Sequence, residues 1–128
     1  MKYQNEPDYI PDDEYSFEFE DIVEEYGYEF DHHHPETEDG YILSLFRVRK
    51  PNLEQGAPVV FFMHGLLDSS DGWVMNGKDD SPAFIMAEAG YDVWLGNSRG
   101  SRFSREHKDI EPDSYDFDEK KAFWNFSW

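Results

Sequence analysis

A pentapeptide of small and polar residues has the clearest potential for chemistry. Gly96-Asn97-Ser98-Arg99-Gly100 has the spacing GxSxG, in which a serine on a sharp turn after a strand acts as a nucleophile. Such a serine needs a histidine as base and an acid that orients the histidine. Only 28 residues (101–128) follow the motif, and His107 is their single histidine. We therefore interpret the motif as a structural turn and predict no catalytic residue in this chain, with Ser98 as a nucleophile the alternative.

Three consecutive histidines, His32, His33 and His34, form a second cluster of reactive side chains. Successive side chains of an extended segment point to opposite faces, so the three cannot converge on one ligand. No carboxylate or further histidine stands at a spacing that would complete a metal site. We expect a solvated turn, no metal and no cofactor. A metal site and a pH-sensitive edge are the alternatives.

Composition narrows the class of protein. The 128 residues are 38% hydrophobic and 18% aromatic, which suffices for a packed core, and the absence of cysteine excludes disulfides and thiolate chemistry. A net charge of −18 makes a nucleic-acid partner unfavourable. No run approaches the roughly 20 apolar residues of a transmembrane segment. The N-terminus shows no apolar region of a signal peptide, so the compartment stays undetermined.

The charge divides the chain into two regions. Residues 1–40 contain 15 acidic side chains and one lysine, whereas residues 41–128 contain 14 acidic and 10 basic ones. Prolines 7 and 11 disfavour a helix near the N-terminus. We predict an acidic, mostly irregular arm over residues 1–19 and a folded region over residues 20–128, with a short helix over 20–26. Docking of the arm on a basic partner is the alternative to a solvated arm.

Turn and strand signals follow the arm. Asp39-Gly40, a pair that tolerates positive φ, precedes a β-prone run over residues 41–48, which predicts a hairpin. Pro35 lacks an N–H, so the incoming strand should lie at a sheet edge or begin after this proline.

The rest of the chain is typical of an α/β fold. The continuous apolar run 58–63 predicts a strand buried on both faces of a parallel sheet. Residues 81–90 combine a capping Ser81, a Pro82 at the first helical position and a Gly90 after the last turn, which predicts a helix. A strand over 91–95 follows. Strand, helix and strand then form a βαβ unit with a right-handed crossover.

These segments, in this order, resemble the N-terminal portion of the acid lipases, an α/β-hydrolase family that includes gastric and lysosomal acid lipases. The resemblance covers about residues 20–128. It rests on the motifs at residues 27–28, 37–43, 64–67, 73, 87–100 and 123–128. The longest of these reads AEAGYDVWLGNSRG and is highly specific. The resemblance implies the N-terminal part of an α/β-hydrolase fold, a hairpin plus a βαβ unit of a mostly parallel sheet that is incomplete in this chain.

The resemblance also implies roles for individual residues. In the family the segment His-Gly-Leu-Leu follows the third strand and supplies an oxyanion-hole amide, which corresponds to the backbone of Leu66. Leu67, Phe62 and Trp73 would suit an acyl-chain pocket, although Phe62 and Trp73 are more typical of a core. The motif around Ser98 would then close the fourth strand, and the nucleophile would lie on a strand beyond residue 128.

The implied function is hydrolysis of neutral lipid esters, such as triacylglycerol or sterol esters, by Ser-His-Asp acyl transfer. The alternative is a lipase-derived binding or structural module without catalysis. Without the next strand, residues 59–63 would form an open edge, and residues 123–128 would end the chain in exposed aromatic side chains. We therefore expect a complementary chain or self-association. The family is commonly secreted or lysosomal, although no signal peptide is visible here.

Overall fold

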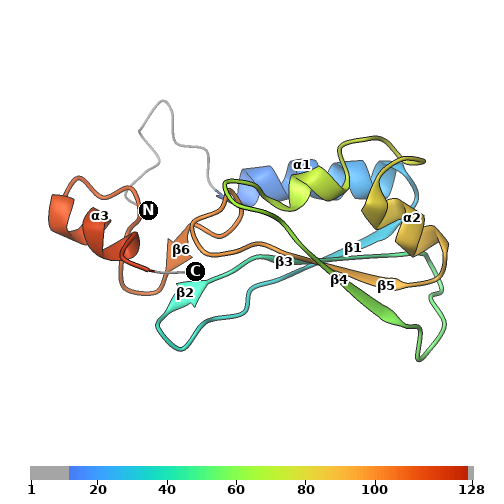
Figure 1. The fold of residues 1–128 in the computed structure, drawn as a ribbon, viewed down its shortest axis with the longest axis horizontal. Helices are drawn as coiled ribbons and strands as arrows, with labels where there is room; N and C mark the ends of the chain where they lie inside the picture. Colours follow the sequence, from blue (N-terminus) through green and yellow to red (C-terminus); the bar gives the residue numbers. More distant parts are fainter. Residues whose placement is uncertain (1–11, 127–128) are drawn as a thin grey trace.

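The computed structural model describes residues 12–126 and contains one main sheet with helices on one side (Figure 1). Its elements are α1 (Asp12–Glu25), β1 (Glu29–His33), β2 (Tyr41–Ile42), β3 (Leu45–Arg49), β4 (Val59–Met63), the 3₁₀ helix η1 (Ser70–Trp73), α2 (Pro82–Glu88), β5 (Asp92–Gly96), β6 (Glu106–His107) and α3 (Phe117–Phe123). The main sheet has the order β1-β3-β5-β4. β3 pairs antiparallel with β1 and β5, whereas β4 and β5 are parallel. β2 and β6 form a separate two-stranded sheet.

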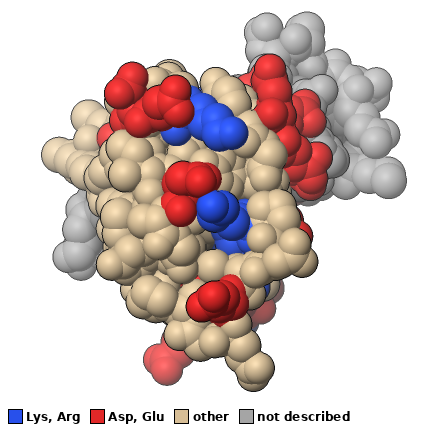
Figure 2. Space-filling view, turned by 90° about the vertical axis from the view of Figure 1, so that its right-hand side faces the viewer, with Lys and Arg blue, Asp and Glu red and all other residues tan. Residues whose placement is uncertain are grey.

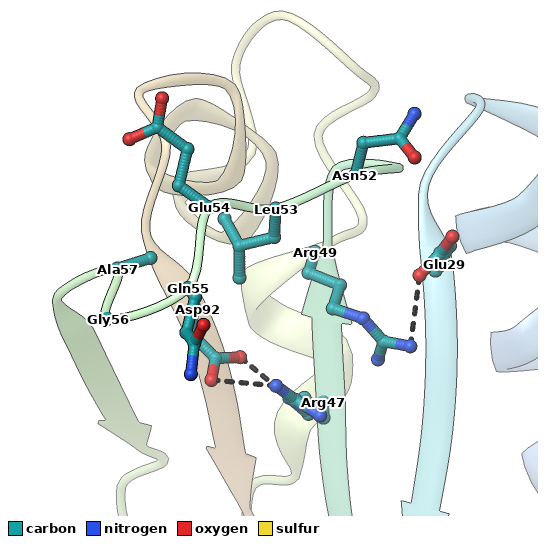
Figure 3. A pocket seen from close by; sticks show the side chains of 10 residues that line it. All are labelled: Glu29, Arg47, Arg49, Asn52, Leu53, Glu54, Gln55, Gly56, Ala57 and Asp92. Carbon is teal, nitrogen blue, oxygen red and sulfur yellow. Dashed lines mark hydrogen bonds and ion pairs between the residues drawn. The ribbon is translucent and has the colours of Figure 1, made fainter.

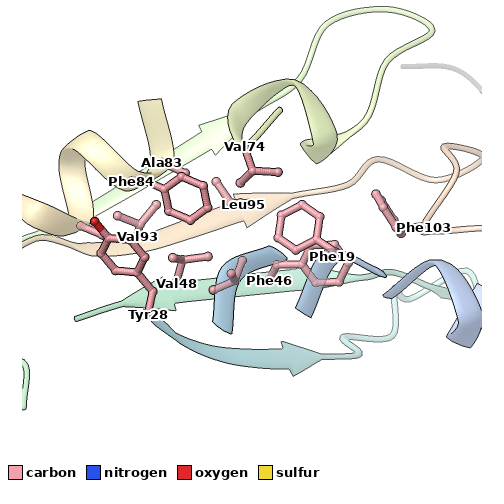
Figure 4. Close-up of a cluster of buried hydrophobic side chains, with 12 residues drawn as sticks. Phe19, Tyr28, Phe46, Val48, Val74, Ala83, Phe84, Val93, Leu95 and Phe103 are labelled. Carbon is pink, nitrogen blue, oxygen red and sulfur yellow. The ribbon is translucent and has the colours of Figure 1, made fainter. Parts of the chain in front are cut away.

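The core lies between the sheet and the two helices that cover it, α1 and α2 (Figures 1 and 4). Alternate residues of each strand point into this layer, as the period of two requires. The fully buried side chains that fill the layer come from α1, α2, β3 and β5: Phe19, Val23, Phe46, Val48, Phe84, Val93 and Leu95. The same alternation sends the other residues of each strand to the opposite face of the sheet.

Helix α1 corrects the prediction for the acidic arm. The helix begins at Asp12, so residues 12–19 are helical rather than irregular. Both prolines of the arm precede Asp12 in the sequence, so neither interrupts the helix. Phe19 and Val23, four residues apart on one helix face, are buried on the sheet, and the Phe19 ring lies 4.6 Å from that of Phe46. Burial of this stripe stabilises a helix that charge alone did not predict. Residues 1–11 of the arm lie outside the described residues.

Helix α2 confirms the helix expected over residues 81–90. Pro82 is its first residue, and Gly90 has a φ of +93°. The N–H of Gly90 donates to the carbonyl of Ala87, and the N–H of Tyr91 donates to that of Met86. These bonds form a Schellman motif, which turns the chain directly into β5. Ser81 makes no side-chain cap, which corrects the prediction, and its Oγ accepts a hydrogen bond from the N–H of Asn76.

Strand β4 is not buried on both faces, which corrects the sequence prediction. Val60 and Phe62 pack toward the helices, but Val59, Phe61 and Met63 are 64%, 57% and 49% exposed. β4 is the last strand of the sheet, and among the described residues no helix covers the face opposite α1 and α2. The apolar run therefore has one buried face and one open face, together with an open edge where the sequence analysis expected it.

The strand expected over residues 41–48 is interrupted. Residues 41–42 form β2, and β3 begins at Leu45. Between them the N–H of Ser44 donates to Ser104 Oγ, and the N–H of Leu43 donates to the carbonyl of Pro35. β1, the partner of β3, is an edge strand that ends before Pro35. The proline thus limits the strand by ending it.

The histidine triplet is not a solvated turn. His32 and His33 belong to β1. His32 Nε2 lies 2.8 Å from Ser44 Oγ, and its ring packs on Phe46, whereas His33 packs on Trp94 on the other face. His32 and His34 share one face, with ring centroids 3.9 Å apart, and His33 points to the opposite face, as the alternation of an extended strand requires. Pairing with β3 makes this segment a strand, although its polar composition did not predict one.

The C-terminal aromatic cluster is partly buried, which corrects the expectation that it would be exposed. Phe123 is fully buried, and the Tyr41 hydroxyl donates to its carbonyl at 2.5 Å. Trp124 is 39% exposed and packs on the Arg105 guanidinium. Helix α3, capped by the Asp116 carboxylate, brings these side chains back against the two-stranded sheet. Residues 127–128 lie outside the described part of the chain.

Candidate functional site

The candidate site lies at the carboxyl ends of the parallel strands β4 and β5. Met63 and Gly96, the last residues of the two strands, are register partners. The segments that follow them, His64-Gly65-Leu66-Leu67 and Asn97-Ser98, therefore leave the sheet side by side. In α/β sheets ligands bind at this end, because the loops that follow neighbouring strands converge there.

His64 and Ser98 connect the two segments. The N–H of Ser98 donates to His64 Nε2 at 3.1 Å, and Ser98 Oγ lies 3.2 Å from the same nitrogen. His64 Nδ1 lies 2.8 Å from the carbonyl of Gly65. Sequence reasoning missed this contact because it looked for a histidine after Ser98 and not before it. The signal was present in the chain, since both residues directly follow predicted parallel strands.

Asn97 makes a second connection. This residue is 2% exposed, and its Oδ1 accepts a hydrogen bond from the N–H of Ser70 at 2.9 Å. Its Nδ2 donates to the carbonyl of Ser44, and its own carbonyl accepts from Ser104 Oγ. A buried amide with both of its ends satisfied holds its neighbours in fixed positions. Asn97 therefore ties three loops to the end of β5.

The residues expected in the site are only partly brought together. Phe62 and Trp73 are half-buried and pack against each other with ring centroids 4.9 Å apart, beside the core. The side chains of Leu66 and Leu67 are 76% and 97% exposed. Leu67 has a φ of +58°, a left-handed conformation that is a genuine outlier for a bulky residue. Strained backbone of this kind clusters at functional sites.

A pocket of about 440 Å³ lies at the opposite end of the same strands (Figure 3). It is lined by the loop 52–57 and by charged residues of β1, β3 and β5. Arg47 binds Asp92 with two hydrogen bonds of 2.7 and 3.0 Å, and Arg49 pairs with Glu29 at 2.9 Å. Hydrogen bonds from Arg47 hold the pKa of Asp92 below its usual value. Both arginines thus have carboxylate partners, which makes this pocket a structural ion-pair network and not an anion site.

The surface seen in Figure 2 has the same character. Its basic side chains lie directly beside acidic ones and form no continuous basic patch. Among residues 12–126 no group of three or more His, Asp or Glu side chains is arranged to hold a metal ion. Within the same residues no helix is long and apolar enough to cross a membrane.

Comparison with known proteins identifies the region that carries this site. Residues 19–77 match the family model of a partial alpha/beta-hydrolase lipase region. This segment is a partial, acid-lipase-like N-terminal region. The match begins in α1, contains β1 to β4 and includes the candidate loop 64–70.

Individual lipases are similar to a longer part of the chain than the family model is. Lipase 1 from Drosophila melanogaster is 49% identical over 107 residues, which are 84% of this chain and 22% of that protein. Human lysosomal acid lipase/cholesteryl ester hydrolase is 45% identical over 121 residues, 91% of this chain and 29% of that protein. Mouse lipase member K is 39% identical over 123 residues, with shares of 93% and 29%. The chain thus spans less than a third of the length of each of these relatives.

Proposed function

We propose that this chain supplies the N-terminal part of a lipase-like carboxylic ester hydrolase, with the backbone N–H of Leu66 as one donor of its oxyanion hole. The observation that carries the proposal is the position of His64-Gly65-Leu66 directly after β4, at the end of the sheet where loops converge. Within the described part of the chain, the Leu66 N–H makes no hydrogen bond. It is therefore available to a ligand.

An amide in this position would act on the transition state. Ester hydrolysis by acyl transfer passes through a tetrahedral intermediate whose carbonyl oxygen carries a negative charge. A donor that is already fixed by the protein stabilises this charge without reorganisation. The nucleophile, the base and the acid would come from polypeptide beyond this chain, and no cofactor is needed for this chemistry.

The fold supports the same proposal. We infer that β1 and β3 are the antiparallel pair, and β4, α2 and β5 the βαβ unit, of an α/β-hydrolase sheet formed by residues 20–128. The open face of this sheet presents Val59, Phe61 and Met63. In such folds helices cover both faces of the sheet. Further polypeptide would cover this face, and it would extend the sheet beyond β4.

Neutral lipid esters are the proposed substrate class. One relative is named as a cholesteryl ester hydrolase, and all of those described above are named as lipases. We propose triacylglycerol or sterol esters on this basis, with Leu67, Phe62 and Trp73 near the acyl chain. Trp73 carries a buried indole N–H that has no hydrogen-bond partner among the described residues.

The experiment compares two substitutions at Leu66 in an active protein. A chimera joins this chain to the remainder of Lipase 1 from Drosophila melanogaster. Leu66→Pro deletes the donor, and we expect kcat to fall roughly 100-fold, equivalent to about 3 kcal/mol. Leu66→Ala keeps the N–H and truncates a side chain that is 76% exposed, so its kcat should remain close to that of the parent. Equal kcat for Leu66→Pro and the parent, with folding confirmed by circular dichroism, would refute the proposed role of Leu66.

A further inference from the structure

We propose that His64, Asn97 and Ser98 are positioning residues that fix the Leu66 amide, so that the GxSxG turn clamps the oxyanion loop instead of supplying a nucleophile. This inference rests on the proposed function. It assigns a role to a motif that the acyl-transfer proposal leaves unused. The relevant segment is residues 64–70, which we call the oxyanion loop.

The first clamp holds the beginning of the oxyanion loop. Because the N–H of Ser98 is a donor, His64 Nε2 must be the acceptor of their 3.1 Å hydrogen bond. The proton of the neutral imidazole is then on Nδ1, which donates to the carbonyl of Gly65 at 2.8 Å. One ring therefore joins the end of β5 to the peptide group between Gly65 and Leu66. The nitrogen of that peptide group is the proposed donor.

The second clamp holds the end of the same loop. The N–H of Ser70 donates to Asn97 Oδ1, and the Asn97 side chain is itself fixed by the carbonyl of Ser44. Asn97 and Ser98 are consecutive, so one turn holds both ends of the oxyanion loop. Between the clamps, Leu67 is kept at a φ of +58° although its side chain is 97% exposed and makes no packing that could hold it there. Strain at an exposed residue persists only when its surroundings over-determine the backbone.

The same geometry argues against Ser98 as the nucleophile. The single lone pair of His64 Nε2 already accepts a hydrogen bond from the N–H of Ser98. The Ser98 hydroxyl, 3.2 Å away, must therefore share this acceptor with the N–H. The Nδ1 side faces a backbone carbonyl and not a carboxylate that would stabilise an imidazolium. His64 and Ser98 are as close as the residues of a catalytic dyad, but the hydrogen bonds of the imidazole go to backbone groups, as in a structural link.

The test uses substitutions that keep or remove the acceptor of the first clamp. In the chimera, His64→Phe keeps a ring and removes both nitrogens, and we expect kcat to fall at least about 10-fold with little change in KM, because the loop loses position and not substrate contacts. His64→Gln restores an acceptor near the position of Nε2 and should recover most of kcat. Ser98→Ala keeps the backbone donor and should retain most of the activity. His33→Phe, at an exposed histidine of β1, is the matched control.

Each result has a defined meaning. Parental kcat in His64→Phe, together with a loss in Leu66→Pro, would overturn the positioning role and leave the proposed function intact. No loss in Leu66→Pro would instead overturn the proposed function. Loss of both kcat and the acyl-enzyme burst in Ser98→Ala would make Ser98 the nucleophile and refute the clamp. If His64→Phe does not fold, ¹⁵N NMR of the unaltered 128-residue chain decides: an acceptor Nε2 on His64 supports the clamp, and a protonated Nε2 refutes it.

Discussion

The open edge of β4 leads to a prediction about association. Phe61 lies in the middle of this strand, is 57% exposed and points away from the helices. We expect the chain to self-associate through β4 and its open face, because an unpaired apolar edge recruits other strands. Phe61→Lys should weaken this association. Ile85→Lys, at an apolar residue of α2 that is 49% exposed, should leave the association unchanged.

The magnitude follows from the exposed fractions. Full burial of a large apolar side chain contributes about 1.5–3 kcal/mol. Val59, Phe61 and Met63 are 64%, 57% and 49% exposed, so roughly half of that contribution is still available from each. Together they can contribute about 3 kcal/mol, or roughly 100-fold in a dissociation constant. Phe61→Lys removes about a third of this, roughly 1 kcal/mol, and adds a charge that must be desolvated, so we expect a weakening of at least about 10-fold.

Hydrogen exchange locates the contact within β4. The N–H of Asp92 donates to the carbonyl of Pro58, and the parallel register pairs Val59 with Asp92. The alternation of a parallel ladder then turns the N–H groups of Val60 and Phe62 toward β5, and those of Val59, Phe61 and Met63 toward the open edge.

Sedimentation velocity and hydrogen exchange, measured against concentration, should therefore agree. The amides of residues 60 and 62 should be protected at all concentrations, and those of residues 59, 61 and 63 only in the associated state. A chain that stays monomeric at about 100 μM, with all five amides protected, would refute this reasoning, because the amides of the open edge would then be protected without a partner strand.

Three further predictions concern a turn, an ion pair and activity. Gly40→Ala should lower the free energy of unfolding by about 2 kcal/mol, because its φ is +92° and a Cβ would lie 2.8 Å from the His107 ring, and thermal unfolding measures this loss. The folded-state pKa of Asp92 is lowered by Arg47, so this pair should contribute stability above about pH 4 that is lost as the pH falls through the lower folded-state pKa. In an acid titration followed by circular dichroism, the stability of Asp92→Asn should fall less steeply with decreasing pH than that of the parent. The 128-residue chain alone should have no esterase activity on a p-nitrophenyl ester, because it lacks an activated nucleophile; burst kinetics that Ser98→Ala abolishes would contradict this prediction.

Local signals in the sequence predicted the elements whose stability is itself local. Helix α2 is one example, because Pro82 and Gly90 act within one turn of its ends. Strand β5 is another, since the chain must turn back after Gly90 and its apolar residues Val93 and Leu95 are buried. These features depend on neighbours in the chain. A short window of sequence therefore contains the residues that determine these two elements.

Features that depend on distant partners were predicted less well. β1 carries a charged and histidine-rich sequence, and pairing with β3 makes it a strand. The first two turns of α1 are acidic, and the helix is held by Phe19 on Phe46, a residue 27 positions away (46 − 19). The contact between His64 and Ser98 spans 34 positions. No short window of sequence contains both partners of such a contact.

The GxSxG motif shows why spacing alone does not establish chemistry. A Cβ on Gly96 would lie 2.6 Å from the Phe61 ring and 2.8 Å from Met63 Sδ, so a larger residue would displace the side chains of β4 that cross the end of β5. A Cβ on Gly100 would lie 2.7 Å from the Trp124 ring, which packs over the turn. Both glycines of the pattern thus have packing reasons that are independent of catalysis. The serine between them meets a histidine, but through its backbone N–H as well as its hydroxyl. What distinguishes a clamp from a nucleophile here is which atom of Ser98 the imidazole binds, and that is a property of the folded chain.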